Sequence, residues 1–229
     1  MSSNRTILVI GSGPGIGRSI STLFASKRYN NVVLIGRRAE QLKLEQAAVE
    51  AASPTVSVKI YAVDATDTAA LLAALDDAEA AFGKPEVIFC NAARVLPSAL
   101  LEHDVKDIEY DFKINVSALY VLAQRYIPDL ITLAKTDPSA QPAFIVTSSL
   151  LPQHPYPPFF ALSLVKAAQR NLMQSLAETY AGQGVHIGVI VVGGPVSPDH
   201  EAWNPENIAA KTWEWFLRAK EEPSFEVLI

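Results

Sequence analysis

Short runs of apolar residues alternate along this chain with longer stretches in which apolar residues recur every three or four positions. The short runs, bounded by turn residues, are typical of buried strands, and the longer stretches are typical of helices that pack by one face. The predicted strands are 7–10, 32–35, 56–63, 87–90, 143–147, 185–192 and 225–228. The predicted helices are 18–29, 39–52, 68–82, 104–127, 159–181 and 205–220, and we expect Pro128 to end the fourth.

This alternation predicts the fold class. Successive parallel strands need a crossover connection, usually a helix, and strands buried on both faces read as nearly continuous apolar runs. We therefore expect an α/β protein of Rossmann type: a doubly wound parallel sheet of seven strands with helices on both faces. Neither an internal repeat nor a linker divides the sequence, so one dinucleotide-binding domain over residues 1–229 is expected.

Four glycines follow the first predicted strand where a helix should begin: Gly11, Gly13, Gly15 and Gly17. Glycine lets the backbone approach phosphate groups, and a helix N-terminus offers free N–H groups and the positive end of its dipole. We interpret this segment as the binding site of a nucleotide pyrophosphate, with Ser12 and Ile16 among the contacts. A tight turn without a ligand is the alternative.

Residues after the other strands would lie at the same edge of the sheet, where ligands of such folds bind. Arg37 and Arg38 follow the second strand, where an NAD site usually carries an acidic residue for the ribose 2′-hydroxyl. Because a guanidinium matches a phosphate in charge and shape, NADP(H) is predicted over NAD(H). A solvated helix start is the alternative for this pair.

The third and fourth strands are followed by further candidates for cofactor binding. Asp64 either accepts a hydrogen bond from an adenine amino group or caps the next helix, and the residues alone leave both interpretations open. Asn91 and its alanine neighbours are small enough to let a cofactor lie close. The candidates from these two positions are Asp64, Ala65, Asn91 and Ala92.

Taken together, these motifs resemble the short-chain dehydrogenase/reductase family over nearly the whole chain. The glycine segment is similar to the family's T-G-x3-G-x-G with Ile10 in place of the threonine, and residues 91–93 resemble part of its N-N-A-G. The resemblance implies an adenine contact for Asp64 and a ribose contact for Lys166. It also implies further positions for catalysis and for the cofactor, namely Asn115, Ser149 and Lys166 for catalysis and Gly193 and Val196 beside the cofactor.

The chain departs from the family's pattern at the proton donor. The family places a tyrosine four residues before the lysine, but Leu162 stands there, and the family's thirteen-residue gap from Ser149 lands on the same residue. The longer spacing of related enoyl reductases lands on Phe159. The resemblance therefore implies cofactor binding without the tyrosine that protonates a carbonyl oxygen.

Three interpretations follow. Tyr156 or His154, in the proline-rich segment 152–158, could supply the proton, although both could be loop-packing or substrate contacts. Alternatively, the substrate is an activated imine or iminium that needs no acid. These two make the protein an NADP(H)-dependent oxidoreductase acting on a small, specialised metabolite, which is our leading hypothesis. The third is a non-redox enzyme, such as a cyclase, or an NADP(H)-binding regulatory module.

Composition narrows the possible partners. The net charge is −5 with scattered lysines and arginines, which is not the footprint of nucleic-acid binding, and no apolar run reaches membrane-spanning length. Cys90 is the only cysteine, so an internal disulfide and a metal site of cysteine pairs are excluded, and no metal is expected. We expect a cytoplasmic protein with a small-molecule substrate and neither nucleic acid nor membrane as partner.

Two expectations concern surfaces. A short substrate lid is expected over residues 194–203, with Trp203 as a candidate roof. The two long helices carry an apolar stripe, and members of the resembled family commonly dimerise through these helices. We therefore predict a homodimer through them, and the alternative is that the stripe is buried in the internal core. The stripe consists of Val165, Ala168, Leu172 and Leu176.

Overall fold

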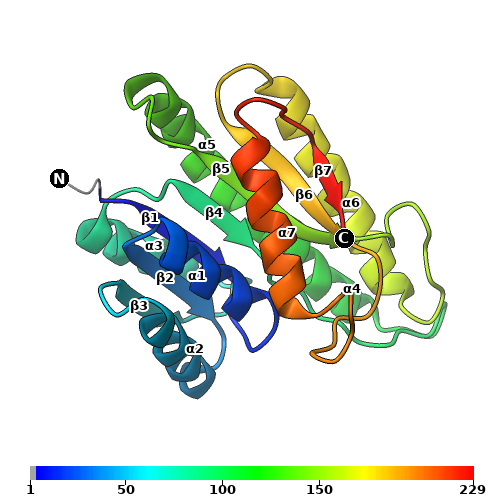
Figure 1. The fold of residues 1–229 in the computed structure, drawn as a ribbon. Helices are drawn as coiled ribbons and strands as arrows, with labels where there is room; N and C mark the ends of the chain where they lie inside the picture. The colour runs from blue at the N-terminus through cyan, green and yellow to red at the C-terminus, as the bar shows by residue number, and fades with distance from the viewer. Residues whose placement is uncertain (1–3) are drawn as a thin grey trace.

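The computed structural model describes residues 4–229, which form a seven-stranded, wholly parallel sheet flanked by helices (Figure 1). The strands are β1 (Thr6–Ile10), β2 (Asn31–Gly36), β3 (Ser57–Ala62), β4 (Val87–Cys90), β5 (Ala143–Ser149), β6 (His186–Val192) and β7 (Glu226–Leu228). Their order across the sheet is β3-β2-β1-β4-β5-β6-β7, so the chain starts near the middle and winds outward in both directions. The predicted doubly wound sheet is confirmed.

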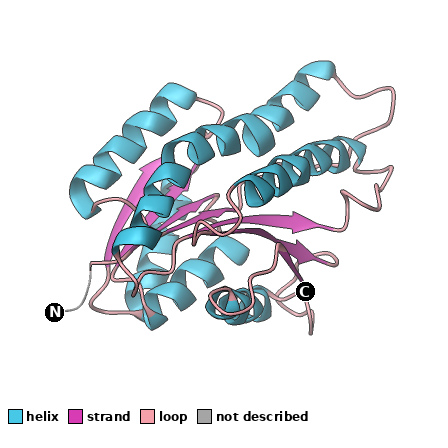
Figure 2. Ribbon diagram, turned by 90° about the horizontal axis from the view of Figure 1, so that it is seen from above, coloured by secondary structure: helices cyan, strands magenta, loops and turns pink. Residues whose placement is uncertain are grey.

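Helices cover both faces of this sheet (Figure 2). One face packs against α1 (Ile16–Lys27), α2 (Ala39–Ala52) and α7 (Pro205–Arg218), and the other against α3 (Thr68–Phe82), α5 (Ala118–Thr136) and α6 (Phe160–Thr179). The short helix α4 (Val105–Phe112) and a π-helical turn, η1 (Lys113–Ser117), lead into α5. Alternate residues of β1 pack against the helices on opposite faces of the sheet: Ile7 and Val9 belong to one apolar cluster and Leu8 to the other. Within residues 4–229, each helix is too short or too polar to cross a membrane.

The predicted helix 104–127 is the element that differs most, since it is divided into α4, η1 and α5 and continues past Pro128. Proline removes one backbone N–H and frees the carbonyl four residues earlier, here that of Gln124. Both residues lie on the exposed face of α5, where water can bond the freed carbonyl. Tyr126 and Leu130 keep burying the opposite face, so the apolar stripe carries the helix through the proline. The other predicted boundaries are shifted by two residues or fewer.

One buried carboxylate connects the amino ends of four neighbouring strands, β2, β1, β4 and β5. Glu86, directly before β4, accepts hydrogen bonds from the guanidinium groups of Arg5 and Arg28, and from the Tyr29 hydroxyl at 3.1 Å. The backbone N–H of Gln141, shortly before β5, donates to it at 3.0 Å. The Glu86 side chain is only 4% exposed, so its negative charge is stable in the interior only while it is paired with the two arginines.

Replacing Glu86 by glutamine should lower the free energy of unfolding by about 3 kcal/mol, because buried Arg5 would lose its close counter-charge and keep only the partly exposed carboxylate of Asp137 at 3.7 Å. Urea unfolding measures this loss. The matched control is Glu40→Gln, which removes an exposed carboxylate paired with Lys43 and should cost less than about 1 kcal/mol. Equal effects of the two substitutions would contradict the structural role of Glu86.

Candidate functional site

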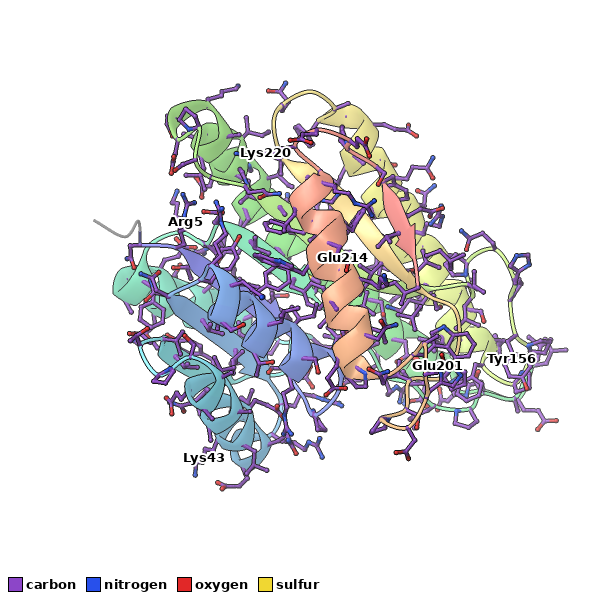
Figure 3. All side chains as sticks on the ribbon, in the orientation of Figure 1. Arg5, Lys43, Tyr156, Glu201, Glu214 and Lys220 are labelled. Carbon is purple, nitrogen blue, oxygen red and sulfur yellow. The ribbon has the colours of Figure 1, made fainter. Side chains whose placement is uncertain are left out.

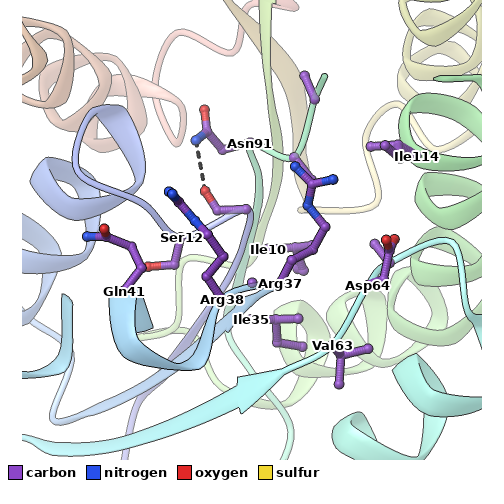
Figure 4. A pocket seen from close by; sticks show the side chains of 15 residues that line it. Ile10, Ser12, Ile35, Arg37, Arg38, Gln41, Val63, Asp64, Asn91 and Ile114 are labelled. Atoms are coloured by element: carbon purple, nitrogen blue, oxygen red, sulfur yellow. Dashed lines mark hydrogen bonds between the residues drawn. The ribbon is translucent and has the colours of Figure 1, made fainter. Parts of the chain in front are cut away.

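The turn between β1 and α1 passes very close to the end of β4. Gly11 has a φ of +87°, and a side chain there would overlap the backbone of Ala92. A Cβ at Gly17 would lie 2.8 Å from the carbonyl oxygen of Gly11, which also accepts a hydrogen bond from Asn91 Nδ2 at 3.0 Å (Figure 4). Gly11 and Gly17 are therefore required by the fold itself.

Gly13 and Gly15 have a different environment, because nothing lies within 4 Å of the position a Cβ would take at either residue. Helix α1 begins directly afterwards, with neither a side-chain cap nor an acidic residue in its first turn. The hydroxyl oxygen of Ser12 is buried and lacks a hydrogen-bond partner within the described residues. Open space beside a helix N-terminus and an unpartnered hydroxyl are suited to a phosphate group.

A cavity of about 230 Å³ opens beside this turn, at the carboxyl ends of β1, β2 and β4. Arg37 and Arg38 extend from the end of β2 into it, toward the side occupied by Ser12 and Asn91 (Figure 4). The predicted cofactor residues that line this cavity are Gly11, Ser12, Arg37, Arg38, Asp64, Ala65, Asn91 and Ala92. The structure thus brings most of the predicted set together.

Asp64 is linked to Arg37 through a tyrosine that the sequence analysis missed. Tyr110 of α4 donates to Asp64 Oδ2 at 2.8 Å and accepts from Arg37 at 3.3 Å. Partial burial alone would raise the pKa of Asp64, but hydrogen bonds from Thr66 and Tyr110 outweigh it and hold that pKa below its usual value. The sequence gives no signal for Tyr110, because its position depends on how α4 packs beside η1 and α6.

A larger cavity of about 940 Å³ shares Asn91 and Ala93 with the first and continues past the ends of β5 and β6. The two together follow the carboxyl ends of the central strands, as expected for a ligand crevice in this architecture. The predicted site residues that line the larger cavity are Gly13, Gly15, Ile16, Ser149, Tyr156, Lys166, Gly193 and Val196.

Three hydroxyl side chains stand at the end of β5, which runs two residues further than predicted. Thr147, Ser148 and Ser149 all line the larger cavity. The hydroxyl oxygens of Thr147 and Ser148 are buried and find no partner in the described part of the chain. Ser149 Oγ accepts from the backbone N–H of Leu151 at 3.3 Å, which leaves its own proton for an oxygen in the cavity.

Lys166 is held by protein groups that carry no charge. Its Nζ donates to the carbonyl oxygen of Thr147 at 2.9 Å and to Oε1 of Gln169 at 2.8 Å, and burial lowers its pKa to about 8. Gln169 in turn donates from Nε2 to the carbonyl oxygen of Asn115 at 3.0 Å. Asn115 therefore connects to Lys166 through Gln169 and does not itself line the cavity. An ammonium has three donors, so within residues 4–229 one of them is left for a ligand.

Leu162 lies one turn before Lys166 on α6 and lines the same cavity, with a 6% exposed side chain. Tyr156 also lines it, in the loop that extends beyond β5 and α6 (Figure 3), and its ring stacks on Phe159. His154 is exposed on the same loop and is not part of the cavity wall. Of the two candidate proton donors, only Tyr156 reaches the site.

The segment between β6 and α7 contributes Gly194, Pro195 and Val196 to the cavity wall, but Trp203 is not its roof. The indole packs against Gly193 and Gly194, and its Nε1 donates to the carbonyl oxygen of Ile229 at 3.0 Å. Trp203 therefore fixes segment 194–203, the predicted lid, to the strand layer rather than closing the cavity. Sequence alone could not distinguish these roles, because both need an aromatic residue in the lid.

The strand order and the crevice at the carboxyl ends of the strands define a doubly wound α/β protein of Rossmann type. A family model described as short chain dehydrogenase matches residues 5–207. The chain belongs to the short-chain dehydrogenase family.

Relatives of known name and solved structures agree with this membership. The short chain dehydrogenase/reductase AacuD of Aspergillus aculeatus is 28% identical over 224 residues, which cover 93% of this chain and 74% of the relative. A metagenomic short-chain oxidoreductase solved in complex with NADP superposes with a TM-score of 0.85 at 23% identity, covering 99% of this chain and 97% of that one. A Pseudomonas aeruginosa short chain oxidoreductase described as containing an atypical catalytic center has a TM-score of 0.76 at 22% identity, covering 96% and 77%.

Replacing Gly13 by alanine should leave the thermal unfolding midpoint unchanged and weaken NADP⁺ binding by about tenfold or more, because the new methyl group would enter the open cradle. Calorimetric titration measures the binding. Gly17→Ala is the contrasting variant: it should lower the midpoint, since its Cβ would press on the Gly11 carbonyl. Unaltered NADP⁺ binding by Gly13→Ala would show that the cradle does not hold phosphate.

Replacing Lys166 by methionine should change stability in a pH-dependent way. The folded pKa of about 8 lies below the ordinary value of 10.5, so the unfolded chain binds more protons between these values and the charged lysine opposes folding at pH 7. The free energy of unfolding of the variant minus that of the natural protein should thus be greatest near pH 7. This difference should decline by up to about 3 kcal/mol as the pH rises from about 8 to 10.5. Urea unfolding across pH measures this, and a flat difference would contradict a buried ammonium.

Proposed function

We propose that this protein is an NADP(H)-dependent oxidoreductase that reduces a carbonyl, or an activated imine or iminium, of a small specialised metabolite. The observation that carries the proposal is the two-part crevice: two arginines line its smaller cavity, and the open glycine cradle, three hydroxyl groups and a lysine line its larger one. Membership of the short-chain dehydrogenase family and the NADP complex of the metagenomic relative support it.

The smaller cavity and the glycine turn beside it suit NADP(H). The N–H groups beside Gly13 and Gly15, which line the near end of the larger cavity, would hold the pyrophosphate, and Ser12 would gain the partner that its buried hydroxyl lacks. Because Arg37 shares Tyr110 with Asp64, part of its charge is already offset, and we assign the 2′-phosphate mainly to Arg38. The bound nicotinamide would supply the hydride.

The residues of the larger cavity would orient the substrate and handle its proton. Ser149 would donate a hydrogen bond from its hydroxyl to the substrate oxygen, and the unused N–H of Lys166 would contact the ribose. Leu162 cannot protonate that oxygen, so Tyr156 is the proposed donor for a carbonyl, and an iminium would need none. A positioned acid contributes about 10² to 10⁴ in rate, so slow reduction of ordinary ketones is expected.

We also propose a homodimer through α5 and α6, although the interface is narrower than the predicted stripe. Val165 is fully buried and belongs to the core. A surface hollow of about 510 Å³ between the two helices is lined by Tyr120, Ala168 and Leu172, among others, and Tyr120 is half exposed. Apolar side chains around a surface hollow are suited to the matching face of a second copy.

The test of the proposed function is NADPH oxidation with a panel of ketones, aldehydes and cyclic imines. The natural protein should turn over at least one class slowly, and Leu162→Tyr should raise ketone reduction by about 10²-fold or more, because it places a phenol one turn before Lys166. The matched control is Leu164→Tyr, on the same helix but 46% exposed and outside the cavity, which should leave the rate unchanged.

Tight NADPH binding without turnover by either the natural protein or Leu162→Tyr would contradict the redox proposal. That result would favour a non-redox enzyme or an NADP(H)-binding regulatory module. Failure to bind either nicotinamide nucleotide would contradict both.

A further inference from the structure

The two cavities of the crevice differ in charge. The smaller one carries Arg37, Arg38 and Asp64 in its wall. In the larger one, Lys166 is the single side chain with a formal charge among the described residues, and no carboxylate lines it. Most of the larger wall is apolar, with Leu162 and Phe159 from the start of α6 and Val95 from the segment after β4.

This apolar wall is a fixed surface that partly faces water. Ser98 joins the two loops that carry Val95 and Tyr156: its N–H donates to the Pro158 carbonyl at 2.9 Å, and its hydroxyl oxygen accepts from the Ala161 N–H at 3.1 Å. Val95 is nevertheless 63% exposed while it lines the cavity. Apolar side chains held in contact with water at the mouth of a cavity indicate an apolar ligand.

The polar end of the same cavity determines which charge the ligand carries. Lys166 donates to a carbonyl oxygen and to an amide oxygen, and the hydroxyls of Thr147 and Ser148 lack partners within residues 4–229. A ligand oxygen could accept hydrogen bonds from the hydroxyls in this part of the wall. A cation would instead lose its hydration in an apolar cavity, meet the lysine, and find no carboxylate to pair with.

We infer that the larger cavity selects an uncharged, largely apolar substrate with one hydrogen-bonding oxygen directed toward Ser149, and that it discriminates against cations, including a preformed iminium. The inference rests on the proposed function, in which the part of this cavity beyond the glycine turn is the substrate site. It favours the carbonyl over the iminium among the two substrate classes proposed above.

A binding experiment with a neutral fluorescent ketone tests this inference without turnover. Prodan, a naphthyl ketone whose emission shifts to the blue in apolar surroundings, is titrated into the full chain with saturating NADP⁺ and then displaced by three competitors of one shape. These are 2-acetylnaphthalene and its derivatives bearing a carboxylate or a trimethylammonium group on the far ring. The neutral ketone should bind about tenfold more tightly than either charged derivative, since a charge at the apolar wall loses its hydration.

The control variants place the same charge inside and outside the cavity. Val95→Asp should weaken Prodan binding about tenfold or more, whereas Val105→Asp, at a valine that is 64% exposed but does not line the cavity, should leave it unchanged. Thermal unfolding confirms that both variants fold. Equal or tighter binding of either charged derivative, failure of Prodan to bind the NADP⁺-saturated protein, or equal behaviour of the two variants would each overturn the inference.

Failure of this inference is distinguishable from failure of the proposed function. NADP⁺ binding is measured separately by calorimetry in the same samples. If the nucleotide does not bind, the proposed function is contradicted, but the Prodan series with nucleotide-free protein still decides which charge the cavity accepts.

Discussion

The passage of the β1–α1 turn against the end of β4 is the contact on which the rest of the site depends. Gly11, with its left-handed backbone, allows the backbone of Ala92 to lie against it, and Asn91 bonds to the carbonyl oxygen of Gly11. These two strands are the neighbours at which the sheet reverses its direction of winding. Connections leave toward opposite faces at such a point, and the crevice opens there. Asn91 therefore lies at the border of both cavities.

From this border the crevice divides into two chemically different halves. The ends of β2 and β3 present charged side chains that suit a phosphorylated nucleotide, whereas the end of β5 presents hydroxyls, and helix α6 and the loops beside it add one lysine and an apolar wall. The division follows from the loops rather than from the sheet, because the long segments after β4 and β5 contribute the apolar residues. Ser98 connects these two segments by hydrogen bonds, so the fold holds the apolar wall in place.

The sequence predicts the fold well because a parallel sheet buried on both faces imposes long apolar runs, and these are visible without any tertiary information. It also predicts residues at strand ends, such as Arg38 and Asp64, since topology alone places them in the crevice. It does not predict Tyr110 or Gln169, whose roles arise from how helices pack across the strands. Pro128 shows the same limit, because a local rule for ending helices was outweighed by a buried stripe.

The environment of Lys166 explains how the site can keep its shape with a leucine at position 162. The lysine is positioned by the backbone of Thr147 and by Gln169, and Gln169 is positioned by the backbone of Asn115 in the π-helical turn. None of these bonds involves the side chain at position 162. The residue at position 162 can therefore change without moving the lysine, whose placement depends on β5 and η1. Reactions that differ in their need for a proton can share such a frame, because only the residue that meets the substrate has to change.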